Sequence, residues 1–137
     1  MSSRQNFSKW CAWEDRKNLA GITEPGVYLL ALFDAPPGTR PVHTRAEVAY
    51  IGETCQQSLR VRLRQFGRSA KNGSAGHSGG KSARKDLRGN WGRLYLSILT
   101  LPNEEGMLRA THIRYLERKF LYEHTRENRR QPKWNSK

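Results

Sequence analysis

Apolar residues along this chain are arranged in short blocks, and the spacing within each block predicts a strand or a helix. Residues 27–33 form one continuous apolar run bounded by turn-forming residues, which predicts a buried strand. Residues 47–51 are rich in β-branched and aromatic side chains, and apolar positions alternate over residues 94–101. Both segments are therefore also predicted to be strands. Residues 34–46 contain Pro and Gly and are predicted to form an insert between the first two strands.

A helix is predicted after the second strand. Ser58 is a suitable N-cap for it. Leu59, Leu63 and Phe66 then recur with the i, i+4, i+7 spacing of a single buried face, and we expect the helix to end shortly after Phe66. Arg62 lies on the same inward stripe, so its positive charge requires a partner in the folded protein.

A longer helix is predicted over residues 104–127. Its apolar residues Ile113, Leu116 and Phe120 share one face. Glu117 is four residues after Ile113 and lies beside that face, so its carboxylate can point toward the core side of the helix.

The remaining segments carry weaker patterns. Residues 1–25 contain two tryptophans and are expected to form a helical extension that packs on the main domain, residues 26–137. Residues 69–82 are rich in Gly, Ser and Lys, have His77 in their middle, and are predicted to be a basic loop. The order strand, strand, helix, strand, helix predicts an α/β (α+β) fold, with a small three-stranded antiparallel sheet flanked by helices.

Net charge adds a functional indication to this picture. The 137 residues suit one domain, and 25 Lys and Arg against 12 Asp and Glu give a formal net charge of +13. Between Thr54 and Asn103 the only acidic residue is Asp86, against ten Lys or Arg. Because a field of this sign attracts a polyanion and binds it through phosphates, nucleic acid is the expected partner. A basic protein without such a partner and a protein bound to an anionic membrane surface are the alternatives.

Several classes of protein are not expected. The sequence has no run of about 18 apolar residues that could span a membrane, and its first residues lead into no apolar core of a signal peptide. Cys11 and Cys55 are far apart and belong to no CxxC pair, so we expect reduced thiols and no zinc site. These features favour a cytoplasmic location, including association with the nucleoid.

Five separated pieces of the sequence can be interpreted as one site. They are Gly26-Val27-Tyr28, Tyr50-Ile51-Gly52, Arg62 in a Leu-x-x-Arg helix, Glu117 on the late helix, and Asn135 after Pro-Lys-Trp. In this order, and with strand for both tyrosines and helix for the arginine and the glutamate, they resemble the GIY-YIG nuclease family. The resemblance spans about residues 26–135. It implies a compact stand-alone endonuclease that hydrolyses nucleic-acid phosphodiester bonds with a metal ion.

The resemblance also implies a role for each residue. Tyr28 is expected to accept a proton from water and Tyr50 to orient water or phosphate, or the reverse. Because a phenol with a pKa of about 10 is a poor base at neutral pH, either role requires a metal and arginines that stabilise the phenolate. Arg62 is expected to bind the scissile phosphate. Glu117 is expected to bind Mg²⁺, with Mn²⁺ as the alternative, in a shell completed by waters and phosphate oxygens.

Three features depart from the family pattern. Many members carry a His or Tyr one helical turn after the catalytic arginine, and Phe66 is found there; His77 is the candidate to supply the missing group. The interval from Glu117 to Asn135 is longer than the family pattern implies, so Asn128 is a rival for the position of Asn135, which is expected to bind phosphate or to tie the tail against the active helix. The two motif tyrosines are also separated by a long segment, as in the restriction-enzyme branch of the family.

Basic residues outside the five pieces are candidates for contacts with the substrate backbone or for plain solvation. They are Arg60, Arg64, Arg68, Lys71 and Lys81. DNA is the expected substrate, cut to leave 5′-phosphate and 3′-hydroxyl ends by a monomer or a homodimer. The alternative from another class is a non-catalytic nucleic-acid-binding module that retains the fold, and a basic structural or interaction protein is a third.

Overall fold

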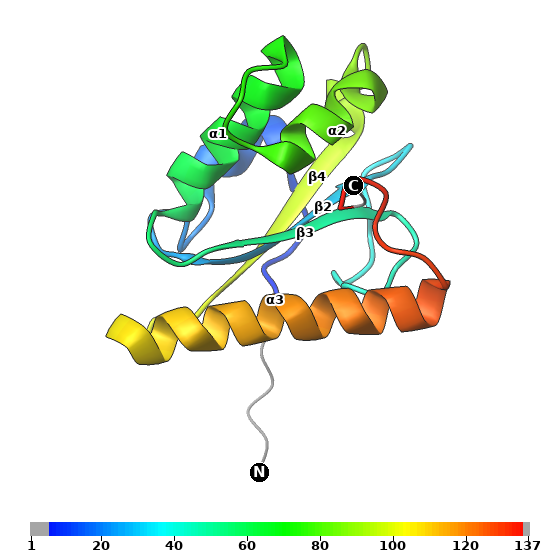
Figure 1. Ribbon diagram of the computed structural model, residues 1–137. Coiled ribbons are helices and arrows are strands. Elements are labelled where there is room, and N and C mark those ends of the chain that lie inside the picture. Colours follow the sequence, from blue (N-terminus) through cyan, green and yellow to red (C-terminus); the bar gives the residue numbers. More distant parts are fainter. Residues whose placement is uncertain (1–5, 136–137) are drawn as a thin grey trace.

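The computed structural model describes residues 6–135, and within them an antiparallel sheet of four strands separates two layers of helix (Figure 1). The strands are β1 (Cys11–Ala12), β2 (Gly26–Leu32), β3 (Val48–Thr54) and β4 (Leu94–Thr100). Their order in the sheet is β1-β4-β2-β3, so β2 is central and β3 is an edge strand. The helices are α1 (Leu59–Asn72), α2 (Ser78–Leu87) and α3 (Gly106–Asn128), with short 3₁₀ helices η1 (Trp13–Asn18) and η2 (Trp91–Arg93).

Two hydrophobic cores lie on opposite faces of the sheet. Tyr28 and Leu30 of β2 pack in the core formed with α1 and α2, whereas Val27 and Leu29 pack in the core formed with α3. Figure 1 shows α3 running along the opposite face from α1 and α2. Because both faces of β2 are covered, its apolar run is continuous rather than alternating, which explains the pattern at residues 27–33.

Most of the predicted elements are confirmed. The three predicted strands are β2, β3 and β4, and the late helix is α3. Ser58 caps α1, since its hydroxyl accepts a hydrogen bond from the Val61 amide at 3.2 Å. Residues 33–47 run as turns and irregular chain between β2 and β3, as expected for an insert. In the described part of the chain, no helix is long and apolar enough to cross a membrane.

The expectation of three strands and an N-terminal helix is wrong. Cys11 and Ala12 pair with Leu96 and Tyr95 and form β1 on the edge of β4, and only the short 3₁₀ helix η1 follows. Trp13 at the start of η1 is buried in the core with α1. The segment therefore packs on the domain as predicted, but part of it completes the sheet, because the outer edge of β4 offers unpaired backbone groups. Residues 1–5 of the predicted extension lie outside the described residues.

The prediction of a loop over residues 69–82 is correct only for the short connection at residues 73–77. The buried stripe of α1 continues to Ala70, the helix ends at Asn72, and α2 begins at Ser78. Gly80 lets the two helices approach, since a Cβ atom there would lie 2.6 Å from the carbonyl oxygen of Phe66. The small residues that favoured a loop are thus the residues that allow α2 to pack closely on α1.

Candidate active site

The candidate site is built around the outer edge of β3. Tyr28 in β2 lies opposite Gly52 in β3, and Tyr50 lies opposite Leu30. Residues opposite one another in antiparallel strands project to the same face of the sheet. Both tyrosines therefore point toward α1 and α2, with ring centroids 5.9 Å apart. The register of two strands brings together motifs that are distant in the sequence.

Gly52 is required for this approach because a side chain there would overlap both rings. A Cβ atom on Gly52 would lie 2.5 Å from Tyr50 Cε2 and 2.6 Å from Tyr28 Cζ, closer than packed side chains can come. Gly79 in α2 lies on the other side of Tyr50, and a Cβ atom there would also overlap the ring. The Tyr50 ring is thus held between the backbones of β3 and α2.

His77 is buried and forms the N-cap of α2. Its Nδ1 atom accepts a hydrogen bond from the Gly80 amide at 3.1 Å, and its Nε2 atom lies 2.7 Å from the Tyr28 hydroxyl oxygen. A backbone N–H can only donate, so Nδ1 carries the lone pair and the neutral ring carries its proton on Nε2. His77 therefore donates to Tyr28. Burial, followed by the charge of Arg62, lowers the pKa of His77 to about 3 and keeps the ring neutral.

The two tyrosines differ in their surroundings. Burial raises the pKa of Tyr28 well above its ordinary value, with a further contribution from Tyr50, while Arg62 opposes the shift. Burial also raises the pKa of Tyr50, but there both the charge of Arg62 and a hydrogen bond from the Tyr28 side chain oppose it. Because His77 donates to Tyr28, the Tyr28 proton is available for Tyr50. The structure thus holds the first bond of a donor series that could run from His77 through Tyr28 to Tyr50.

Arg62 lies on α1 beside both tyrosines. Its Nη1 atom donates to Gln65 Oε1 at 2.8 Å and to the Gly76 carbonyl oxygen at 3.0 Å, and these two bonds fix the orientation of the guanidinium. Its charge lowers the pKa of both motif tyrosines and of His77. The cation on the inward stripe of α1 therefore faces the polar groups of the candidate site.

Glu117 reaches the edge of β3 from the other face of the sheet, which α3 covers (Figure 1). Its side chain is 20% exposed and lines a pocket of about 390 Å³. The other lining residues are Glu53, Arg114, Arg118 and Leu121. Burial raises the pKa of Glu117, the charge of Glu53 raises it further, and Arg118 opposes the shift. Glu117 also raises the pKa of Tyr50, so the two side chains interact across the edge of β3.

Glu53 is a candidate residue that the sequence analysis missed. It follows the Tyr50-Ile51-Gly52 motif directly, and β3 continues through it to Thr54. Side chains alternate along a strand, so Glu53 points to the same face as Ile51, which packs in the core with α3. The predicted strand ended at Ile51; extending the two-residue period by one step indicates Glu53.

Glu53 and Glu117 could together bind a hard divalent cation. Carboxylate oxygens are preferred ligands of Mg²⁺ and Mn²⁺, and an open pocket leaves room for bound waters. A cation would also relieve the repulsion that raises the pKa of Glu117. Among residues 6–135, no group of three or more His, Cys, Asp or Glu is arranged to hold a metal. Water and substrate oxygens would therefore have to complete the shell.

Asn135 is bonded to β3 and not to a helix. Its Oδ1 atom accepts from the Ile51 amide and its Nδ2 atom donates to the Ile51 carbonyl oxygen, both at 2.9 Å. The adjacent Trp134 is buried and its amide donates to the Ala49 carbonyl oxygen at 2.9 Å. The tail is thus held against the edge of β3 by these bonds. Its rival Asn128 instead donates to the Thr44 carbonyl oxygen at 2.8 Å and holds the insert.

The five predicted backbone-binding residues are all exposed. They are Arg60, Arg64, Arg68, Lys71 and Lys81. Arg60 and Arg64 line a pocket of about 240 Å³ between α1 and η1, together with Arg16 and Lys17. These four cations outnumber the one acidic residue of the pocket, Glu14, and make it a basic surface beside α1.

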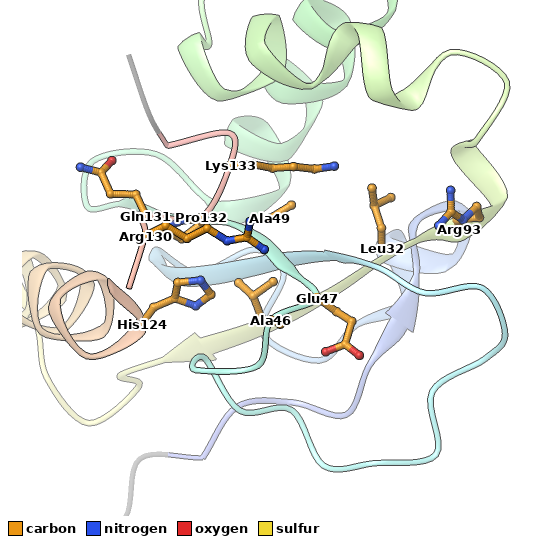
Figure 2. Close-up of a pocket in the computed structure, with 11 residues that line it drawn as sticks. Leu32, Ala46, Glu47, Ala49, Arg93, His124, Arg130, Gln131, Pro132 and Lys133 are labelled. Carbon is orange, nitrogen blue, oxygen red and sulfur yellow. The ribbon is translucent and has the colours of Figure 1, made fainter. Parts of the chain in front are cut away.

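Another pocket of about 240 Å³ lies where the tail meets the start of β3 (Figure 2). Figure 2 shows Arg93, Arg130 and Lys133 around it, with Glu47 and the ring of His124. Of the five motif pieces, only Pro132 and Lys133, which precede Asn135 in the last piece, line this pocket. Arg93 is paired with Asp34 at 2.7 Å and Lys133 with Asp86 at 3.3 Å. Two of the cations that line this pocket therefore already form ion pairs within the fold.

Comparison of the chain with protein-family models, with curated proteins and with solved structures finds no match in any of the three. The fold is of the α+β class. Function is therefore inferred from the geometry around the edge of β3.

Proposed function

We propose that this protein is an endonuclease of the GIY-YIG type, which hydrolyses DNA phosphodiester bonds with a divalent metal ion and leaves 5′-phosphate and 3′-hydroxyl ends. One observation carries the proposal: the two tyrosines, His77 and Arg62 meet on one side of the β3 edge, and Glu117 lies on the other. Phosphodiester hydrolysis requires a proton acceptor, a cation that binds the phosphate and a metal-binding carboxylate. These residues include one candidate for each.

We assign the proton-accepting role to Tyr50 and the supporting role to Tyr28, the second of the two orders open from the sequence. Tyr28 is completely buried and its hydroxyl oxygen accepts from His77, whereas Tyr50 is only partly buried. A hydroxyl that has accepted one hydrogen bond can donate its own proton to the next oxygen, which stabilises a phenolate at Tyr50. In this series of hydrogen bonds His77 acts as a donor, because its only ring lone pair already accepts from the Gly80 amide.

Arg62 supplies the positive charge for the phosphate. Its guanidinium is already oriented by Gln65 and Gly76, so little side-chain entropy is lost when a phosphate oxygen binds. A fixed guanidinium stabilises the extra negative charge of the transition state more than that of the substrate. Arg62 thereby contributes to the rate as well as to binding.

Glu117 would hold the metal ion, with Glu53 as a second oxygen ligand. When bound, Mg²⁺ or Mn²⁺ neutralises phosphate charge and lowers the pKa of a coordinated water. Both carboxylates line one pocket with Arg114 and Arg118. These two cations lie beside the carboxylates, where they could bind the phosphates of a DNA backbone held at the metal.

The proposal is tested by incubating the protein with end-labelled duplex, single-stranded and forked DNA and with RNA, in Mg²⁺, in Mn²⁺ and in EDTA. We expect cleavage of DNA in either metal, none in EDTA, and products that a ligase can rejoin because they carry 5′-phosphate and 3′-hydroxyl ends. Binding of every substrate without cleavage in either metal would overturn the proposal.

That second outcome would favour a non-catalytic nucleic-acid-binding module that retains the fold. The observation on its side is the complete burial of Tyr28, which raises its pKa well above the ordinary value. A module of this kind needs the basic surface but neither tyrosine hydroxyl. Substituting both tyrosines by Phe would then leave every measurable activity unchanged.

A further inference from the structure

Four large apolar side chains are exposed on α3, although the helix is buried along its other side. Tyr115 is 60% exposed and Tyr122 is 63% exposed. Met107 and Leu108, near the start of the helix, are 81% and 68% exposed. Exposed apolar side chains that gather on one face, unlike scattered single ones, commonly mark a binding surface.

The helical period explains why these tyrosines share a face. Tyr115 and Tyr122 are seven residues apart, so they lie on one line along the helix, about 10 Å from each other. The side chains that pack against the sheet are on the other side: Ile113, Leu116, Phe120 and His124. Figure 1 shows this long helix with one side against the sheet and the other turned away from it.

The same exposed face is positively charged. Arg114, Arg118, Lys119 and Arg126 are all exposed, and the Arg118 side chain is 85% exposed. Arg126 lies 5.2 Å from the centroid of the Tyr122 ring, a cation–π contact. We refer to the two tyrosines and these four cations as the outer face of α3.

The outer face of α3 is continuous with the candidate active site. Arg114 and Arg118 line the pocket that contains Glu53 and Glu117. Arg118 is three residues after Tyr115 and four before Tyr122, which makes it a neighbour of both rings on the helix surface. A nucleic-acid strand that is bound at the two carboxylates and runs on past Arg114 and Arg118 would next contact Tyr115 and Tyr122.

Charge decides which partner fits. A second copy docked through this face would place four cations against four cations, which disfavours self-association. A nucleic-acid strand has the opposite charge for the four cations and flat bases for the two rings. A base can stack on an exposed tyrosine only when it is not already stacked and paired inside a duplex.

We propose that the outer face of α3 binds an unpaired strand of the DNA substrate, with bases stacked on Tyr115 and Tyr122 and phosphates paired with the four cations. The inference deepens the proposed nuclease function, and it names the substrate class as DNA with a single-stranded part beside the cleavage point. Because the two rings are about 10 Å apart, each takes a separate base.

The test measures binding without cleavage. Fluorescence anisotropy in EDTA compares a labelled oligothymidylate of about 20 nucleotides with a duplex of the same length, for wild type and for three double variants at Tyr115 and Tyr122. We expect tighter binding of the single strand by wild type. The Ala pair should weaken single-strand binding by roughly tenfold per tyrosine and change duplex binding little. The Phe pair should retain wild-type binding, and the Leu pair should behave like the Ala pair.

Three results would overturn the inference: an equal loss for duplex and single strand, full retention by the Leu pair, or a wild-type dimer that the Ala pair converts to monomer in sedimentation. Both positions are exposed, so circular dichroism should show an unchanged fold for all variants. Because the assay contains no metal, its outcome is separate from that of the cleavage assay. Cleavage with no preference for unpaired DNA would reject this inference and leave the nuclease proposal intact.

Discussion

The His77 Nε2 atom lies 2.7 Å from the Tyr28 hydroxyl oxygen, while the Nδ1 atom of the same ring caps α2 by accepting from the Gly80 amide at 3.1 Å. The start of a helix and a strand tyrosine are thus joined through a single imidazole. Because the cap uses the lone pair, the bond to Tyr28 has one direction only. His77 is at once part of the fold and part of the proposed site.

These two roles of His77 can be separated by substitution. Asn is a good N-cap but is too short to reach Tyr28, so His77→Asn should retain the cap that His77→Ala loses. We expect the Asn variant to be more stable than the Ala variant by about 1 kcal/mol in urea unfolding. Both variants should lose single-turnover cleavage to a similar extent, since neither donates to Tyr28. If His77→Asn cleaved DNA at the wild-type rate, the hydrogen bond from His77 to Tyr28 would make no contribution to catalysis.

His77 should also make stability depend on pH. Its pKa is lowered to about 3 in the fold, whereas an unfolded histidine has a pKa of about 6.5. Between these two pKa values the unfolded chain binds a proton that the folded protein does not. The stabilising contribution of neutral His77 is therefore full above about pH 6.5 and is lost as pH falls toward 3. The slope should be about 1.4 kcal/mol per pH unit in that window. The measurement is the difference between wild type and His77→Asn across the range, and parallel curves would contradict the prediction.

The tyrosine hydroxyls should differ in their effect on cleavage. Tyr50→Phe removes the proposed proton acceptor and should reduce the single-turnover rate by roughly 10²–10⁴-fold. Tyr28→Phe removes one supporting hydrogen bond and should cost about tenfold. Because burial raises the pKa of Tyr50, the reactive phenolate is scarce at neutral pH, and the wild-type rate should increase with pH between about 7 and 9. A larger loss for Tyr28→Phe would return the accepting role to Tyr28.

Gly52 should tolerate no side chain. In Gly52→Ala the new Cβ atom would overlap the rings of Tyr28 and Tyr50, which we expect to cost about 1–3 kcal/mol of unfolding free energy and to displace both hydroxyls. Gly38→Ala is the matched control, since a Cβ atom there meets no heavy atom within 4 Å. Thermal unfolding and cleavage of the two variants should therefore differ sharply. Equal stability of both would indicate that β3 can shift away from the rings at little cost.

Hydrophobic spacing predicted the parts of the fold that depend on long buried stripes. The apolar run of β2 was identified because it is continuous and bounded by turn residues, and the stripe of α3 because a helix of that length leaves a clear period. β1 has two residues and carries no period of its own. α2 was mistaken for a loop because Gly79 and Gly80, which bring it close to Tyr50 and to α1, are also typical of loops.

The site was predictable where a residue type and its spacing define a role, and not where the role depends on the tertiary structure. Tyr28, Tyr50, Arg62 and Glu117 could be selected together from the sequence, and the fold brings them to the edge of β3. The hydrogen-bond direction of His77 depends on a cap that only the structure reveals. The bonds of the Asn135 amide to β3 likewise depend on where the tail folds back.

The most direct test of the nuclease proposal is metal-dependent cleavage by Glu117→Gln beside Glu127→Gln. Both substitutions remove one carboxylate charge from α3, but Glu127 is exposed and lies outside the pocket of Glu53 and Glu117. We predict that Glu127→Gln cleaves forked DNA in Mg²⁺ like wild type, and that Glu117→Gln binds the DNA but does not cut it in Mg²⁺ or Mn²⁺. Equal cleavage by the two variants would contradict the account, because the carboxylate proposed to hold the metal would then be dispensable.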